Sequence, residues 1–71
     1  MAQLTITFYE CENFEDLNEY ISDIQLCGGR VLDKSVDHEE EIGRTVIEVD
    51  DLDVFKARFA CTSSSEFTDL S

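Results

Sequence analysis

The chain has no proline, a single histidine, and only five lysine and arginine residues against seventeen aspartate and glutamate residues, so its formal net charge is −12. No lysine or arginine occurs in the first 29 residues. A surface so poor in cations repels nucleic acid and anionic membranes, because both carry negative charge themselves. The composition therefore argues against direct binding of nucleic acid or membranes and favours a partner with a basic protein surface.

A disordered chain is the first alternative to test, because high net charge is typical of disorder. The 42% hydrophobic content, the five phenylalanines and the lack of proline indicate a packed core instead. We therefore expect residues 1–71 to form a single folded domain. A domain of this size buries only about 60% of its unfolded surface, and its like charges repel one another, so we expect salt to stabilise the fold.

The three cysteines, Cys11, Cys27 and Cys61, include no CxxC pair. Their odd number suits free thiols in a reducing cytoplasm, and their wide spacing does not suit a zinc site. The N-terminus has neither the basic region of a signal peptide nor the long apolar run of a membrane-spanning helix. These observations predict a cytoplasmic protein.

Residues 4–9 alternate strictly between apolar residues and residues suited to a solvated face, which predicts a half-buried strand. Leu4, Ile6 and Phe8 share one face of that strand. The other face carries Thr5, Thr7 and Tyr9.

A helix is predicted to follow from Asn13, which is a good N-cap residue. Its apolar stripe has helical spacing and consists of Phe14, Leu17, Tyr20, Ile21, Ile24 and Cys27. Gly28 and Gly29 supply its end, so the Gly28-Gly29-Arg30 sequence indicates a helix C-cap rather than a phosphate cradle, which would precede a helix.

The remaining elements are less regular. Periodicity predicts a strand over residues 30–37, whose register is uncertain, and then a loop or frayed hairpin end over residues 37–43. A further strand is predicted over residues 44–49. The last predicted helix begins after Asp50 and Asp51 and ends at residues 62–65. Residues 66–71 are expected to form either a short fourth strand or a disordered tail.

This order, β-α-β-β-α with or without a final strand, fits the split βαβ, ferredoxin-like plan of the α+β class. In that plan both helices cover one face of an antiparallel sheet. The other face stays open, and Tyr9 on it could mediate a homodimer or a partner contact. A polar face in water is the alternative. The plan serves many functions and does not fix one.

The residues that could carry chemistry lack the necessary surroundings. His38 lies between Asp37 and Glu39 on an expected loop, without the pocket and positioned partner that acid–base catalysis needs. The acidic run from Asp37 to Glu41 lacks the spacing of a calcium-binding EF-hand loop. We therefore expect no enzyme activity, no specific metal site and no cofactor.

A helical wheel at about 100° per residue places four acids opposite the apolar stripe: Glu15, Asp16, Glu19 and Asp23. Acids spaced four apart mildly destabilise a helix, because their charges repel. We therefore infer that something other than local stability has shaped this ridge. An ordinary solvated helix face is the alternative.

The expected partner-binding residues are Glu12, Glu15, Asp16, Glu19 and Asp23, with a second patch of Asp37, Glu39, Glu40 and Glu41. A third acidic cluster comprises Glu48, Asp50, Asp51 and Asp53. Whether the three clusters join depends on the tertiary structure.

In size, charge and single-domain make-up the chain resembles phage-encoded inhibitors of bacterial defence, including anti-CRISPR and anti-restriction proteins. The resemblance implies a non-enzymatic module that inhibits or regulates a basic, nucleic-acid-handling protein by mimicking nucleic acid. Acids four apart on a helix rise about 6 Å, which is similar to the spacing of phosphates along a strand. Two alternatives stay open: a small-molecule-binding regulatory domain that acts as a ferredoxin-like dimer, and a structural or assembly subunit.

Overall fold

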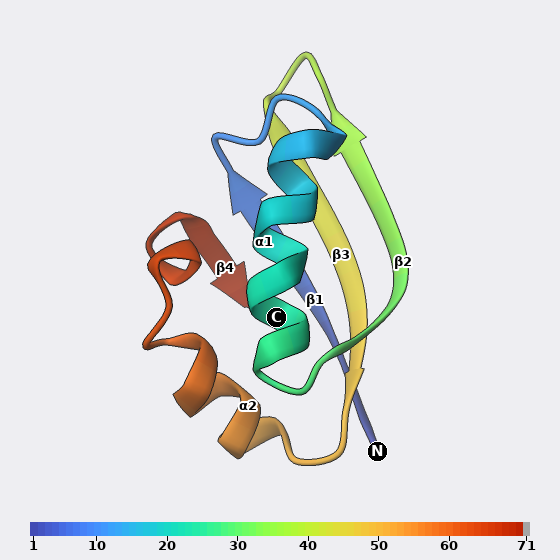
Figure 1. Cartoon of the computed structure of the whole chain (residues 1–71). Coiled ribbons are helices and arrows are strands. Elements are labelled where there is room, and N and C mark those ends of the chain that lie inside the picture. Colours follow the sequence, from blue (N-terminus) through green and yellow to red (C-terminus); the bar gives the residue numbers. More distant parts are fainter. Residues whose placement is uncertain (71) are drawn as a thin grey trace.

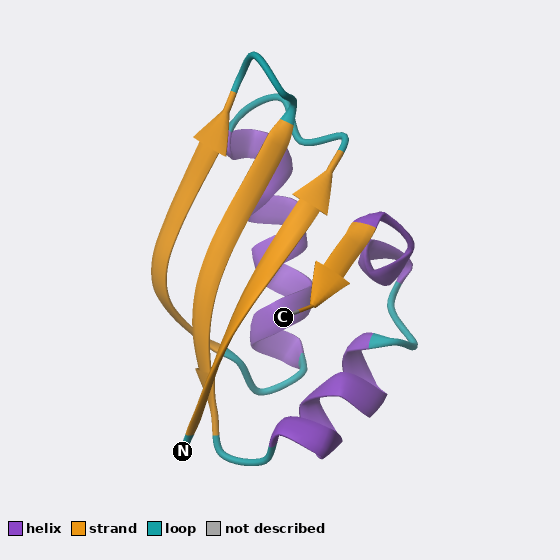
Figure 2. Cartoon of the chain, turned by 180° about the vertical axis from the view of Figure 1, so that it is seen from behind, coloured by secondary structure: helices purple, strands orange, loops and turns teal. Residues whose placement is uncertain are grey.

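The computed structural model describes residues 1–70 and consists of a four-stranded antiparallel sheet with two helices against one of its faces (Figure 1; Figure 2). In chain order the elements are β1 (Ala2–Tyr9), α1 (Phe14–Leu26), β2 (Arg30–Asp37), β3 (Ile42–Val49), α2 (Leu52–Phe59), the short 3-10 helix η1 (Ser63–Phe67) and β4 (Thr68–Leu70). The strands lie in the order β2-β3-β1-β4. This arrangement confirms the predicted α+β, split βαβ plan.

The core lies between the sheet and the two helices. Leu4, Ile6 and Phe8 of β1 are buried, as their alternation predicts. The ring of Phe8 stacks on Tyr20 of α1 at 4.6 Å between centroids, and it meets Phe59 of α2 edge-on at 6.5 Å. This group of rings therefore ties the central strand to both helices.

Helix α1 begins and ends where local sequence signals predict. The Asn13 side chain accepts a hydrogen bond from the backbone N–H of Asp16 at 2.9 Å, and Gly28 adopts a φ of +94° just beyond the helix. Leu17, Ile21 and Ile24 are buried. Phe14 differs from the rest of the predicted stripe, because its side chain is 46% exposed at the first residue of the helix.

The uncertain register of the second strand has a structural cause. Its pairing with β3 shifts between Val31 and Asp33, so Leu32 is the extra residue of a β-bulge and is 48% exposed. Strand β3 begins at Ile42, two residues before the predicted start, and residues 38–41 form the turn of a β2–β3 hairpin.

The C-terminal segment resolves the choice between a strand and a tail. Thr68–Leu70 pairs with β1 as β4, with Phe8 opposite Thr68 and Ile6 opposite Leu70. The 3-10 helix η1, which precedes it, was not predicted. Ser71, the last residue of the segment predicted as strand or tail, lies outside the described residues. Among residues 1–70, no helix combines the length and apolar character needed to cross a membrane.

Candidate functional site

Two loops that are distant in the sequence meet at one end of the sheet, where β1 leads into α1 and β2 turns into β3 (Figure 1). The backbone N–H of Cys11 donates a hydrogen bond to the Glu41 carbonyl oxygen at 2.9 Å. The His38 ring bonds through Nδ1 to the Glu12 carbonyl oxygen at 2.6 Å. A carbonyl can only accept, so Nδ1 carries the proton. These two contacts fix the loops against each other.

Together the loops form a surface that we call the acidic end, made of residues 10–16 and 37–41. Each segment contributes four acids, and neither contains lysine or arginine. Asp16 is half-buried and the others are exposed. They are Glu10, Glu12, Glu15, Asp16, Asp37, Glu39, Glu40 and Glu41. The structure thus joins the N-terminal acids of α1 to the predicted second patch.

Two of these acids occupy a backbone conformation that most side chains avoid. Glu10 has a φ of 59° and Glu41 a φ of 57°, which are left-handed values. Glycine and asparagine are the usual residues there, because a β-carbon crowds the backbone. Sequence reasoning missed Glu10, since nothing local marks a left-handed residue at the end of a strand.

The predicted ridge on α1 divides into two kinds of acid. Glu15 and Glu19 are exposed on the outer face of the helix. The Asp16 carboxylate accepts a hydrogen bond from the Glu12 backbone N–H at 3.2 Å, and the half-buried Asp23 carboxylate accepts one from the Ser64 hydroxyl. A helical wheel cannot predict the second contact, because Ser64 comes from η1.

The third acidic cluster lies at the opposite end of the sheet. The β1–β3 register places Val49 opposite Ala2 there, whereas Ile42 lies opposite Tyr9 at the acidic end. Two of its acids have local partners: Glu48 forms an ion pair with Arg30 at 3.4 Å, and Asp51 caps α2. The cluster therefore does not extend the acidic end.

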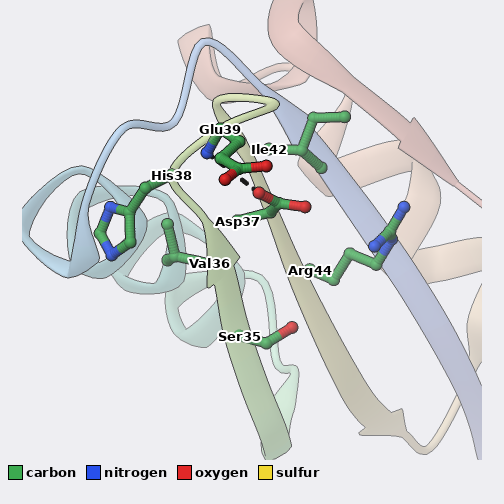
Figure 3. Close-up of a pocket in the computed structure, with 7 residues that line it drawn as sticks. All are labelled: Ser35, Val36, Asp37, His38, Glu39, Ile42 and Arg44. Carbon is green, nitrogen blue, oxygen red and sulfur yellow. Dashed lines mark hydrogen bonds between the residues drawn. The ribbon is translucent and has the colours of Figure 1, made fainter.

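A shallow hollow of about 570 Å³ adjoins the acidic end on the β2–β3 hairpin (Figure 3). Asp37 is held in place at its edge, because its Oδ1 accepts hydrogen bonds from the backbone N–H groups of Glu39 and Glu40 at 3.0 and 3.3 Å. The lining residues are Ser35, Val36, Asp37, His38, Glu39, Ile42 and Arg44. Sequence analysis singled out the acids and the histidine but missed Ser35, Ile42 and Arg44, whose roles depend on strand pairing.

The negative charge of the acidic end affects the pKa of a neighbouring side chain, Tyr20. Burial raises the pKa of Tyr20, and negative charge from Cys11, Asp16, Glu10 and Glu19 raises it further. Burial also raises the pKa of the Cys11 thiol, with Asp16 adding to the effect. A raised pKa keeps a thiol protonated and therefore weakly nucleophilic.

The surroundings of His38 and of the possible metal ligands can be described for residues 1–70. His38 Nδ1 is engaged with a main-chain carbonyl rather than with a side chain that could relay a proton. Among residues 1–70, no three His, Cys, Asp or Glu side chains are grouped so as to hold a metal ion.

No family model matches the chain, and neither a curated protein nor a solved structure matches it. The functional interpretation therefore depends on the geometry and charge of the acidic end.

Proposed function

We propose that the chain is a non-enzymatic protein-binding module whose acidic end occupies the basic, nucleic-acid-binding surface of another protein and so inhibits or regulates it. The observation that carries the proposal is the joining of two acidic loops by the Cys11–Glu41 and His38–Glu12 contacts. Eight acids, four from residues 10–16 and four from residues 37–41, then share one end of a small domain.

The pairing of the loops matters because binding costs less when the binding groups are already in place. A loop that orders only on association loses conformational entropy at that moment. Here two hydrogen bonds and the adjoining strand pairs hold the acids before a partner arrives. A fixed field of one sign also steers a basic partner toward this end and raises the association rate.

The placement of these acids is unfavourable for the stability of the isolated domain. Glu15 of the acidic end lies four residues before Glu19, one turn further along α1, and like charges at this spacing repel. Glu10 and Glu41 occupy left-handed conformations that favour glycine. Acidic residues at positions where they lower the stability of the domain support a role in binding.

In its sharpest form the proposal is a nucleic-acid mimic of the kind that phage-encoded anti-CRISPR and anti-restriction inhibitors supply in the host cytoplasm. The outer acids of α1 and the turn between β2 and β3 would take the positions of phosphates in the partner's groove. Neither the domain nor its partner would undergo a chemical step.

The proposal is tested first by capture from the lysate of the native host, with a salt step for elution and identification by mass spectrometry. We expect a basic, nucleic-acid-handling protein that salt releases, because charge-dominated contacts weaken with ionic strength. A protein that captures nothing and forms a dimer by itself would contradict the proposal and favour a ligand-binding regulatory dimer.

The site is then tested with the double variant Glu15→Lys, Glu19→Lys, which reverses one charge of the acidic end and one charge a turn further along the outer face of α1. We expect about a tenfold or larger loss of affinity for the captured partner, because two attractive charges become repulsive. The matched control is Asp50→Lys, Asp53→Lys, which changes the same charge on exposed residues at the opposite end. Circular dichroism confirms that both variants fold. Equal losses in the two variants, or no loss in the first, would exclude the outer face of α1 at the acidic end as the contact surface.

A further inference from the structure

The sheet face beside the acidic end carries two neighbouring apolar side chains, Ile42 and Tyr9. Along β3, Gly43 and Thr45 are buried toward the helices, so Ile42 and Arg44 lie on the opposite face. Ile42 is half-buried and lies directly opposite Tyr9, whose side chain is 45% exposed. Residues opposite each other on antiparallel strands have β-carbons about 5 Å apart on the same face. Figure 2 shows that no described helix covers this face of the sheet.

Carboxylates lie beside Ile42 on the same face. Asp37 and Glu39 line the hollow whose wall includes Ile42 (Figure 3). Because Asp37 Oδ1 accepts two backbone N–H groups, its Oδ2 is held in a defined direction, and no hydrogen bond to Oδ2 occurs among residues 1–70. Ile42 lines the hollow beside Asp37 and Glu39, and Tyr9 lies opposite Ile42 on the neighbouring strand, so this surface suits a long side chain that has an aliphatic stem and a positive tip.

The hollow also contains a cation of its own. Arg44 lines it but forms no ion pair with an acid of the described chain, and Figure 3 shows its side chain extending away from Asp37 and across β1. Its charge is therefore not neutralised at the hollow. A positively charged guest would be repelled by Arg44 and attracted by Asp37 and Glu39.

We propose that this hollow receives an arginine side chain of the basic partner. The guanidinium group lies at the carboxylates of Asp37 and Glu39, and the aliphatic stem packs on Ile42 and the ring of Tyr9. Arginine fits better than lysine, because its planar fork binds carboxylates through two hydrogen bonds and its weakly hydrated face stacks on an aromatic ring. The inference rests on the proposed function and names the partner group that the hollow recognises.

The test uses two fluorescent peptides of equal length, one made only of arginine and one only of lysine, titrated against the full chain by anisotropy. We expect the arginine peptide to bind about fivefold more tightly or better at equal charge. Asp37→Asn combined with Glu39→Gln should abolish that preference. The asparagine retains the Oδ1 acceptor, so the turn keeps its hydrogen bonds to Glu39 and Glu40.

Two further variants separate the hollow from general charge. Asp50→Asn with Asp53→Asn removes the same charge at the opposite end and should leave the arginine preference unchanged. Arg44→Gln should raise the affinity for the arginine peptide by more than about twofold, because it removes the cation nearest the guest. A merely structural role of Arg44 would not produce that gain.

Equal binding of the two peptides, or an equal effect of the charge pairs at the two ends, would overturn the arginine site. Its failure is distinguishable from failure of the proposed function. If the natural partner still loses affinity with Glu15→Lys, Glu19→Lys but is indifferent to Asp37→Asn, Glu39→Gln, the acidic end binds the partner without this hollow.

Discussion

At the scale of single residues, Cys11 both joins the two acidic loops and gives the fold a dependence on pH. Its thiol is fully buried; burial raises its pKa above the ordinary value of 9.0, Asp16 adds to the rise, and the backbone of Asn13 opposes it. The folded state therefore keeps a proton that the unfolded state releases. The resulting stability is complete below about pH 9 and is lost as the pH rises through the pKa of the folded state.

We expect the urea midpoint to fall between pH 8 and pH 10.5, and the Cys11→Ala variant, although less stable overall, to show a smaller fall. Cys27 and Tyr20 also have raised pKa values and account for the remaining slope. Cys61→Ala, at an exposed position, is the control and should behave as the wild type. An unchanged slope in Cys11→Ala would refute this explanation.

At the scale of elements, the acidic residue Glu41 in the β2–β3 turn lowers the stability of the folded domain. Glu41 has a φ of 57°, where glycine avoids the steric cost of a β-carbon. We expect Glu41→Gly to raise the free energy of unfolding by about 0.5–1 kcal/mol and to weaken partner binding. Glu41→Gln removes the charge but keeps the β-carbon, so the stability difference between the two variants isolates the backbone effect. Equal stability of the glycine and glutamine variants in urea would show that the turn is not strained.

At the scale of the whole molecule, repulsion among acids dominates the electrostatics. A single ion pair, Arg30–Glu48, occurs among residues 1–70, so salt has little attraction to screen. We expect the melting temperature to rise by about 4–8 °C between low salt and about 0.2 M sodium chloride, which corresponds to about 1 kcal/mol for a domain of this size. An uncharged sugar at equal osmolality controls for general solute effects. A melting temperature that falls over this range would contradict the dominance of repulsion.

The elements that could be predicted are those specified by local interactions. Asn13, the apolar spacing of α1 and Gly28 define a helix without reference to the rest of the chain. The alternation in β1 identified its buried face for the same reason. The bulge at Leu32 and the helix η1 were not predicted, because each depends on contacts with another segment of the fold.

The candidate site divides in the same way. The identity of the acids, their excess over cations and the position of Glu15 and Glu19 on the outer face of α1 follow from the sequence, because charge and helical period are local properties. The engagement of Asp23 with Ser64 and the placement of Ile42 beside Tyr9 required the packed structure.

The amino-acid sequence by itself determined a small acidic α+β domain with a capped first helix and an amphipathic first strand. Only the tertiary structure decided which acids act together. Strand pairing places residues 10–16 next to residues 37–41. It places the third acidic cluster, Glu48 to Asp53, at the other end of the sheet. The physical reason is that charge and periodicity belong to each segment, whereas proximity depends on which strands share hydrogen bonds and in which register.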